Sequence, residues 1–307
     1  MGEHVLVIGA MLLDTKGKPT SGLEPGTSNP GKIRFTRGGT ARNVSENLGR
    51  LGASVKLVSA IGQDLTGERL LQQTAAAGVD IERVQVIEGE NTGAYIAIIE
   101  NDGSLAVALD DVSVMEHVTP KFLHDHRRLF RDADMVMIDG SLTLPAMKTA
   151  VRLADQYGVP LCADPSSARL AYKLRPYLPS LHLVVPNVVE AAELCQMDYY
   201  ETDDSLDLAR RLSQLGVGTV ILTRPDFGLD YATTDETGHI PANYSEMVDS
   251  TGTGDAVTAA VMFGMINNLS TIESIRLGAA AASLTLQTEE TAVPDLSLDM
   301  LYEHLIV

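Results

Sequence analysis

Short apolar runs alternate along the chain with longer stretches in which apolar residues recur every three to four positions. The short runs are typical of buried strands, and the longer period is typical of helices with one buried face. This pattern predicts strands over residues 4–8, 54–59, 135–138, 161–163, 183–185 and 220–222. It predicts helices over residues 41–51, 67–77, 146–157, 189–195 and 206–215.

The alternation of strand and helix predicts the α/β class, with a mostly parallel sheet that helices cover on both faces. We expect residues 1–307 to form one domain around this sheet. Ligands of such sheets bind beyond the carboxyl ends of the strands. The polar and glycine-rich stretches that follow the strands are therefore the places to look for chemistry.

Two segments break the alternation. The first, residues 15–37, is rich in Gly, Pro and Thr. The second contains two apolar runs, 94–99 and 105–108, joined by Asn101-Asp102-Gly103, which is a strong hairpin signal. We expect residues 15–37 and 92–112 to pair as a small β-sheet lid that excludes water from the site.

Composition narrows the class of partner. The chain has 307 residues, of which 45% are hydrophobic, and its formal net charge is −18. A protein that wraps nucleic acid needs a basic surface, so this charge argues against a nucleic-acid partner. No apolar run is long enough to cross a membrane, and the chain enters its first strand without a basic leader. We therefore expect no membrane partner and a cytoplasmic location.

The tract Gly252-Thr253-Gly254-Asp255 stands directly before an apolar, helix-like run. Its two glycines let a ligand approach the backbone closely, and the first amides of a helix attract anions. Asp255 could accept a proton from a hydroxyl group aimed at that anion. The alternative interpretation is an aspartate that caps a helix after a tight turn.

Polar groups follow other strands in the same way. Gly38-Gly39 opens the first long helix, and Asn43 lies one turn further on. Asp14 follows the first strand and could accept hydrogen bonds from a diol. Asn187 and Glu190 share one helix face, where they could contact a hydrated magnesium ion and a phosphate. Several polar groups at strand ends are not easily explained as helix caps alone.

Three motifs together resemble the ribokinase-like (PfkB) family of sugar and nucleoside kinases. They are Gly-Gly-x-x-x-Asn at residues 38–43, Asn-x-x-Glu at 187–190 and Asp-x-Thr-Gly-x-Gly-Asp at 249–255. The resemblance covers essentially the whole chain. It implies a three-layer fold with a mostly parallel sheet, flanking helices and a small β lid. It also implies phosphoryl transfer from ATP to a sugar or nucleoside hydroxyl.

The resemblance also implies roles for individual residues. Asp255 is expected to be the base, and the turn Gly252-Thr253-Gly254 the anion hole for the transferring phosphoryl group. Asn187 and Glu190 are expected to organise Mg²⁺, largely through water, and the ATP phosphates. Residues expected to bind the acceptor are Asp14, Gly38, Gly39, Arg42 and Asn43, and those matching a loop that often carries K⁺ are Asp249 and Thr251.

The nucleotide loop departs from the family pattern. It is expected to contribute Thr223, Arg224 and Gly228 to the ATP site, but Pro225 stands where a glycine is common. Proline fixes φ and lacks an N–H donor, so it could alter the nucleotide pocket. Arg224 either reaches a phosphate in compensation or lies solvated at the surface. The tract 287–291 also replaces the more usual Arg-x-Gly-Ala near the adenine and the cation loop.

Within the family, several tracts resemble the pseudouridine kinases. They are residues 28–33, followed by the glycine pair with Arg42, and residues 89–92 and 294–297. This likeness implies transfer to the 5′-hydroxyl of pseudouridine. Residues then expected to contact the base near the lid are Thr92, Tyr95 and Asp111, although Tyr95 could equally pack within the lid sheet.

Other interpretations stay open from the sequence. One is a kinase of the same family for another nucleoside or a sugar such as ribose, and another is a non-catalytic binding protein on the same fold. A Rossmann oxidoreductase is disfavoured because the first strand is not followed by Gly-x-Gly-x-x-Gly. The resemblance also suggests a homodimer that forms through the lid.

Overall fold

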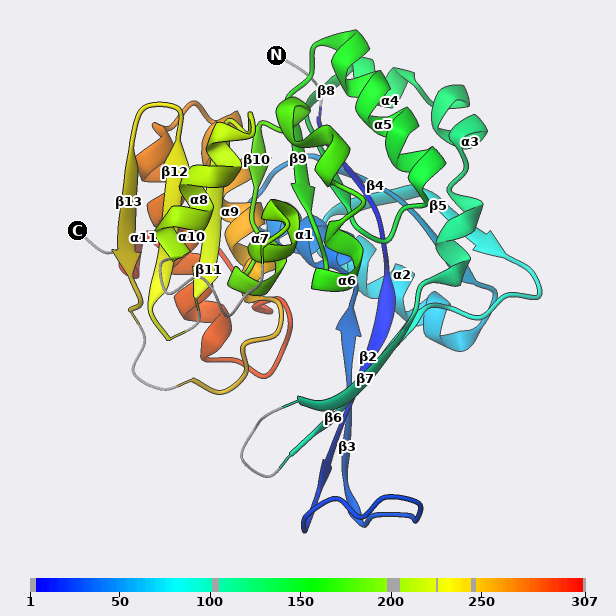
Figure 1. The fold of residues 1–307 in the computed structure, drawn as a ribbon. Helices are drawn as coiled ribbons and strands as arrows, with labels where there is room; N and C mark the ends of the chain where they lie inside the picture. The colour runs from blue at the N-terminus through cyan, green and yellow to red at the C-terminus, as the bar shows by residue number, and fades with distance from the viewer. Residues whose placement is uncertain (1–3, 101–104, 198–204, 225, 244–246, 306–307) are drawn as a thin grey trace.

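Figure 1 shows the fold, a computed structural model that describes residues 4–100, 105–197, 205–224, 226–243 and 247–305. A large sheet runs through its centre in the order β13-β12-β11-β10-β9-β8-β1-β4-β5. The pairs from β5 to β11 are parallel, and β12 and β13 form an antiparallel edge. The strands are β1 (His4–Ile8), β4 (Val55–Gly62), β5 (Val79–Ile87), β8 (Ala133–Asp139), β9 (Leu161–Asp164), β10 (Leu183–Val184), β11 (Thr219–Arg224), β12 (Gly228–Thr233) and β13 (Thr237–Pro241).

Helices cover both faces of this sheet. One face carries α1 (Thr40–Arg50), α2 (Leu65–Ala76), α9 (Thr253–Ile266), α10 (Thr271–Leu286) and α11 (Leu298–Glu303). The other carries α3 (Pro120–Asp125), α4 (Arg128–Arg131), α5 (Leu144–Tyr157), α6 (Ala168–Ala171), α7 (Val188–Cys195) and α8 (Ser205–Gln214). Among the described residues, the 3₁₀ turn η1 (Ser113–His117) precedes α3, and η2 (Arg175–Ser180) lies between α6 and β10. The predicted three-layer α/β architecture is confirmed.

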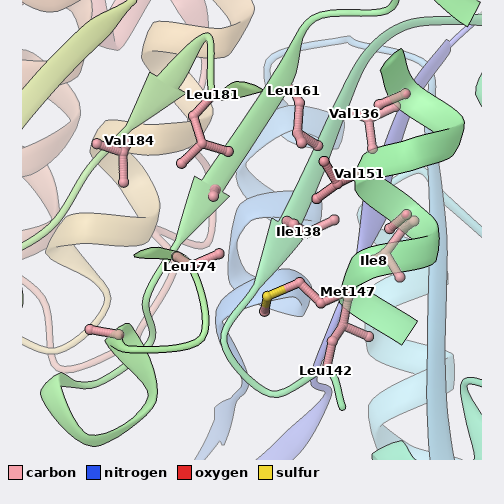
Figure 2. Close-up of a cluster of buried hydrophobic side chains, with 14 of the residues drawn as sticks. Ile8, Val136, Ile138, Leu142, Met147, Val151, Leu161, Leu174, Leu181 and Val184 are labelled. Atoms are coloured by element: carbon pink, nitrogen blue, oxygen red, sulfur yellow. The ribbon is translucent and has the colours of Figure 1, made fainter. Parts of the chain in front are cut away.

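Alternation along the buried strands divides the core in two. In β1, Leu6 and Ile8 pack toward α5, whereas Val5 and Val7 pack toward α1 and α9. Figure 2 shows the first of these clusters, where Ile8 lies among residues of β8, β9 and α5. Because successive side chains of a strand point to opposite faces, a strand buried on both sides is apolar throughout.

Every helix and strand predicted above is present, with ends that differ by up to three residues. The strands β5, β12 and β13 were not predicted. β5 and β13 lie at the two edges of the sheet, where they expose part of their residues and so lack a continuous apolar run. β12 lies between β11 and β13, and three of its six residues are only partly buried.

The four-stranded lid sheet has the order β3-β2-β6-β7 and projects away from the helical layers in Figure 1. Its strands are β2 (Leu12–Pro19), β3 (Gly31–Gly38), β6 (Ala94–Ile99) and β7 (Leu105–Asp111). The lid therefore begins before residue 15, and Asp14 lies on a lid strand rather than in the loop after β1. The expected hairpin turn at 101–103 and Pro225 lie outside the described residues.

Among the helices of the described residues, none is both long enough and apolar enough to span a membrane.

Candidate active site

The turn before α9 is shaped as an anion-binding site. Gly252 has φ of 82°, and a Cβ at this position would lie 2.1 Å from the carbonyl oxygen of Thr291. Only glycine meets both conditions. A Cβ at Gly254 would meet nothing within 4 Å, so the backbone there faces open space. The first amides of α9 are thus accessible to an anion.

Asp255 lies in the first turn of α9, where Asn43 of α1 donates a hydrogen bond of 2.5 Å to its carboxylate. These residues come from two motifs separated by 212 positions. Burial raises the pKa of Asp255 to about 7, although the Asn43 hydrogen bond and Arg42 oppose that rise. A carboxylate with this pKa holds and releases a proton near neutral pH, which suits a general base.

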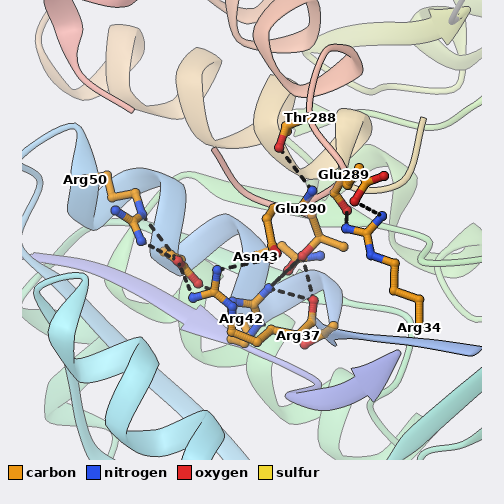
Figure 3. A network of polar contacts seen from close by, with 11 residues as sticks. Arg34, Arg37, Arg42, Asn43, Arg50, Thr288, Glu289 and Glu290 are labelled. Carbon is orange, nitrogen blue, oxygen red and sulfur yellow. Dashed lines mark hydrogen bonds and ion pairs between the residues drawn. The ribbon is translucent and has the colours of Figure 1, made fainter. Parts of the chain in front are cut away.

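Arg42, which the sequence leads us to expect at the acceptor, is fully buried, and protein groups engage its guanidinium. Its guanidinium pairs with the buried Glu46 and donates to Asn43 Oδ1, to the carbonyl oxygen of Gly38 at 3.0 Å and to Thr291 Oγ1 at 3.0 Å. Figure 3 shows this arrangement. Arg42 orients Asn43, which in turn holds Asp255.

Glu46 is the centre of that network. Besides Arg42, it pairs with Arg37 at 3.0 Å and Arg50 at 2.8 Å, so three arginines surround one fully buried carboxylate. Arg37 also reaches Glu290 at 3.5 Å. The network connects the lid strand β3, helix α1 and the tract after α10, and it fixes the side of the site next to Asn43 (Figure 3).

Asp14 faces the site from the lid. It is 6% exposed, and burial raises its pKa to about 6, against the opposing effects of Arg42 and Lys16. A Cβ at Gly38 would lie 2.0 Å from Asp14 Oδ1, and a Cβ at Gly39, whose φ is 92°, would lie 2.3 Å from the carbonyl oxygen of Ala10. The glycine pair thus lets the lid strand and the start of α1 meet.

Tyr95 lies on the same face of the lid sheet as Asp14, whereas Asp111 does not. Tyr95 is the strand partner of Asp14 and of Asp110, so all three lie on the same face of the lid sheet. Asp111 lies on the opposite face and accepts hydrogen bonds from the Ser113 backbone at 3.0 Å and hydroxyl at 2.6 Å. Asp110 is therefore the acidic residue of β7 that faces Asp14.

Thr92 forms hydrogen bonds within the protein. Its hydroxyl donates to Asp64 at 2.8 Å and accepts from the Gly62 amide at 3.2 Å, and its own amide donates to Asp64 at 2.8 Å. Asp64 is the N-cap residue of α2. Thr92 thus ties the start of the second lid segment to α2, and its hydrogen-bonding groups are engaged there.

Asn187 and Glu190 form a capping box at the start of α7, with reciprocal hydrogen bonds of 2.9 Å. Burial raises the pKa of Glu190 to about 7. Burial also raises the pKa of Asp164, at the end of β9, well above its usual range, and Asp255 and Glu190 raise it further. These three carboxyl groups repel one another, so a cation near them would be stabilised.

A magnesium ion held mainly through water and phosphate oxygens fits this arrangement. The described residues contain no group of three or more His, Cys, Asp or Glu side chains placed to ligate a metal directly. Mg²⁺ keeps several of its waters and is often bound by one or two carboxylates together with substrate phosphates. Glu190 and Asn187 could serve in that way.

A pocket lies between β11–β12 and α9–α10, where the sequence leads us to expect the nucleotide. The pocket is lined in part by Thr223, Arg224, Gly228 and Thr253. Thr223 also forms an isolated parallel β-bridge with Asn187. Thr253 Oγ1 is buried and has no hydrogen-bond partner among the described residues, so a ligand in this pocket could supply one. Arg224 donates to Ser205 at 2.9 Å, lies 3.4 Å from Asp230 and stacks over Phe227.

Asp249 and Thr251, the residues expected to carry K⁺, already contact a cation from the protein. Lys16 Nζ lies 2.8 and 2.6 Å from the two Asp249 oxygens and also donates to Thr251 Oγ1. The ammonium of a lid residue thus stands where the resemblance implies a soluble ion.

Comparison with known proteins identifies the family. The profile of the pfkB family carbohydrate kinases matches residues 3–297. This chain belongs to the pfkB family of carbohydrate kinases. The kinase is therefore a phosphotransferase that acts on a hydroxyl group, with ATP as co-substrate, and the interpretation as a non-catalytic binding protein is set aside.

The names of the relatives of this kinase indicate different acceptors. A pseudouridine kinase from Escherichia coli is 31% identical over 297 residues, covering 96% of this chain and 94% of that protein. A guanosine-inosine kinase from Exiguobacterium acetylicum is 27% identical and covers 96% of this chain and 98% of that protein. The ribokinase structure from Arabidopsis thaliana superposes with a TM-score of 0.84 at 21% identity and covers 100% of both chains, which establishes the fold.

Sequence reasoning missed two site residues of this kinase, Lys16 and Asp139. Asp139 ends β8, is fully buried and accepts hydrogen bonds from the amides of Ala10 at 2.8 Å and Ala41 at 3.2 Å. It therefore fixes the loop after β1 against the start of α1. Its position directly after an apolar strand was a signal that could have found it, whereas nothing local indicated the partner of Lys16.

Proposed function

We propose that this kinase transfers the γ-phosphoryl group of ATP to the 5′-hydroxyl of pseudouridine. One observation supports the chemistry most: Asp255 lies beside the open amides of α9 and is held by Asn43 from the acceptor side. The choice of acceptor rests on the pseudouridine kinase relative and on the tracts at 28–33, 89–92 and 294–297. The guanosine-inosine kinase relative makes another nucleoside the second candidate.

In the proposed reaction, Asp255 accepts the proton of the 5′-hydroxyl as the hydroxyl oxygen bonds to the γ-phosphorus. The bond from the γ-phosphorus to the β–γ bridging oxygen breaks, and ADP leaves. The amides after Gly252 face the charge of the transferring group, and such preorganised donors usually contribute most to the rate. Magnesium, held by Asn187 and Glu190 largely through water, would supply charge neutralisation at the phosphates.

On the acceptor side, Asp14 and Asn43 would bind the ribose hydroxyls, with Tyr95 and Asp110 toward the base. The lid strands carry three of these four residues, so binding and closure would occur together. Arg42 acts as a positioning residue because its buried guanidinium holds Asn43. On the donor side, ATP would occupy the pocket of Thr223, Arg224, Gly228 and Thr253.

We also propose that the outer face of the lid sheet pairs two copies of the chain. On this face Ile33, Phe35 and Leu109 are 65–71% exposed, although they are large and apolar. They lie opposite the face of Asp14, as the strand register requires. A sedimentation experiment should show a dimer that the double substitution Phe35→Ser and Leu109→Ser converts to monomer, and a monomeric native chain would contradict the assignment.

The test of the acceptor is an ADP-release assay with ATP, magnesium and a panel of pseudouridine, uridine, guanosine, inosine and ribose. We expect the largest kcat/KM with pseudouridine, and phosphate NMR of the product should place the new ester at the 5′ position. Preference for guanosine, inosine or ribose would overturn the acceptor but keep the chemistry. Retention of activity by Asp255→Asn would overturn the base.

A further inference from the structure

The loop from Asp249 to Thr251 does not fit a soluble potassium ion, because an ammonium occupies the same oxygen atoms. Lys16 Nζ contacts both carboxylate oxygens of Asp249 and the hydroxyl of Thr251. We propose that Lys16 is the built-in cation of this loop and positions the anion hole of the kinase without a monovalent cation from solution. The inference rests on the phosphotransferase function of the site.

The backbone shows how the contact acts on the anion hole. The Asp249 carboxylate accepts the Thr251 amide at 2.9 Å, so Lys16, Asp249 and Thr251 form one closed set of contacts. Thr251 directly precedes Gly252, whose positive φ turns the chain into α9. On the other side, the Val248 amide is anchored to the carbonyl oxygen of Leu286 at 2.8 Å. The loop is thus fixed at both ends when Lys16 is in place.

The carboxylates near Asp249 favour a cation beside it. The side chains of Lys16 and Asp249 are 19% and 21% exposed, so water screens the pair only in part. Burial works to raise the pKa of Asp249, but the hydrogen bonds from Lys16 and Thr251 and the charge of Lys16 together outweigh it, and the pKa is lowered. Asp249 in turn contributes to the raised pKa of Asp14. Without Lys16, the buried carboxylate of Asp14 and the partly buried carboxylate of Asp249 would repel each other without its compensating charge.

The contact also joins the lid to the catalytic loop. Lys16 lies on β2, and its strand neighbour Arg34 on β3 pairs with Glu289 at 3.1 Å. Both basic side chains reach from the same face of the lid to the tracts beside α9 and α10. The cation therefore reaches the loop only when the lid lies over the site, a dependence that a freely diffusing ion would not impose.

The first experiment measures turnover in tetramethylammonium chloride, with K⁺, Rb⁺ or NH₄⁺ exchanged in at constant ionic strength. We expect the native kinase to change less than about twofold, since the loop already holds a charge-assisted contact. Lys16→Ala should lose roughly 10- to 100-fold in kcat and recover about tenfold with NH₄⁺ or K⁺. Lys16→Met, which keeps the bulk without the charge, should lose activity and not recover.

Two controls isolate the site. Lys18→Ala, on the same strand and exposed, should behave as the native kinase in every salt. Lys16→Ala combined with Asp249→Asn should not be restored by cations, because the carboxylate that would bind them is gone. Strong potassium activation of the native kinase, or a Lys16→Ala variant with native kcat, would overturn the proposal.

Hydrogen exchange supplies a readout that does not need turnover. In Lys16→Ala, the amides of the peptide over 249–255 should exchange at least about tenfold faster than in the native chain, and NH₄⁺ should slow them. Unchanged exchange in this peptide would overturn the positioning role. If the native kinase turns over no acceptor of the panel, the acceptor proposal fails, while this measurement still decides the role of Lys16.

Discussion

The two sides of Asp255, proposed above to bind the acceptor and the nucleotide, are built in different ways. On the acceptor side, buried charges are held by other buried charges: Asp14 lies near Arg42, and Arg42 pairs with Glu46. On the nucleotide side, the pocket is lined largely by small and uncharged residues such as Gly228, Ala279 and Ala282. The acceptor side is a rigid polar network, whereas the nucleotide side is lined mainly by backbone and methyl groups.

The difference corresponds to what each ligand needs. An acceptor hydroxyl must be aimed at phosphorus with little freedom, because small errors of position cost much of the rate. A purine ring and its phosphates are bound well by apolar contacts and backbone amides. Changes on the acceptor side should therefore affect kcat and stability, whereas changes on the nucleotide side should affect the KM for ATP.

The largest effect is expected from Asp255→Asn, at the boundary between the two sides. The amide cannot accept the proton, so kcat should fall by about 10²–10⁴-fold while ATP still binds. Steady-state kinetics and calorimetric titration with ATP measure the two quantities. A variant that keeps turnover within a few-fold of native would show that another group is the base.

The pH profile should reveal the same group. Burial raises the pKa of Asp255 to about 7, and only the ionised form accepts a proton. Below this pH, kcat should fall about tenfold per unit, so it should be about 100-fold lower at pH 5 and constant above pH 8. Asp14, with a pKa of about 6, should instead change the KM of the acceptor. A kcat independent of pH down to 5 would contradict the assignment.

Glu46→Gln tests the rigidity of the acceptor side. It removes the carboxylate charge that three arginines share, one of them fully buried. The free energy of unfolding should fall by about 3–5 kcal/mol, as measured by urea denaturation. The exposed Glu82→Gln is the matched control and should stay within about 0.5 kcal/mol of native. Equal stability of both variants would show that the network contributes no rigidity.

A smaller effect should separate neighbouring residues of β7. Asp110→Asn should raise the KM of the acceptor by about tenfold, the size expected for one charged hydrogen bond. Asp111→Asn, on the opposite face of the lid, should leave that KM unchanged. The KM of the acceptor, measured for both variants, tests this difference. The reverse result would mean that β7 pairs in a different register when the acceptor is bound.

The smallest effect is expected on the nucleotide side. Thr253→Val removes a buried hydroxyl that has no hydrogen-bond partner in the part of the chain that the structure describes, so it should stabilise the protein by about 1 kcal/mol. The same change should raise the KM for ATP several-fold. Thr74→Val, on α2, removes another buried hydroxyl with no partner among the described residues and should stabilise the protein without that change in KM. An unchanged KM for ATP in Thr253→Val would place the nucleotide elsewhere.

Sequence patterns predicted the architecture because strands buried on both faces are apolar throughout, and glycine-rich motifs mark the turns where backbone meets ligand. They could not decide which face of β7 meets the site, since a shift of one position exchanges Asp110 and Asp111. They could not show that Arg42 is fully buried and paired with Glu46. The contact of Lys16 with Asp249 joins residues 233 positions apart, and no local signal reveals it.

The hydrogen bond between Asn43 and Asp255 also has a consequence during synthesis. A ribosome that adds 5–20 residues per second needs roughly 10 to 40 s to cover the 212 positions between them. Through that time α1 lacks α9, the apolar helix that later packs against it, so the nascent chain exposes an uncovered apolar surface. Chains released early would carry this surface without the catalytic base, which makes them substrates for chaperones and proteases rather than partly active kinases.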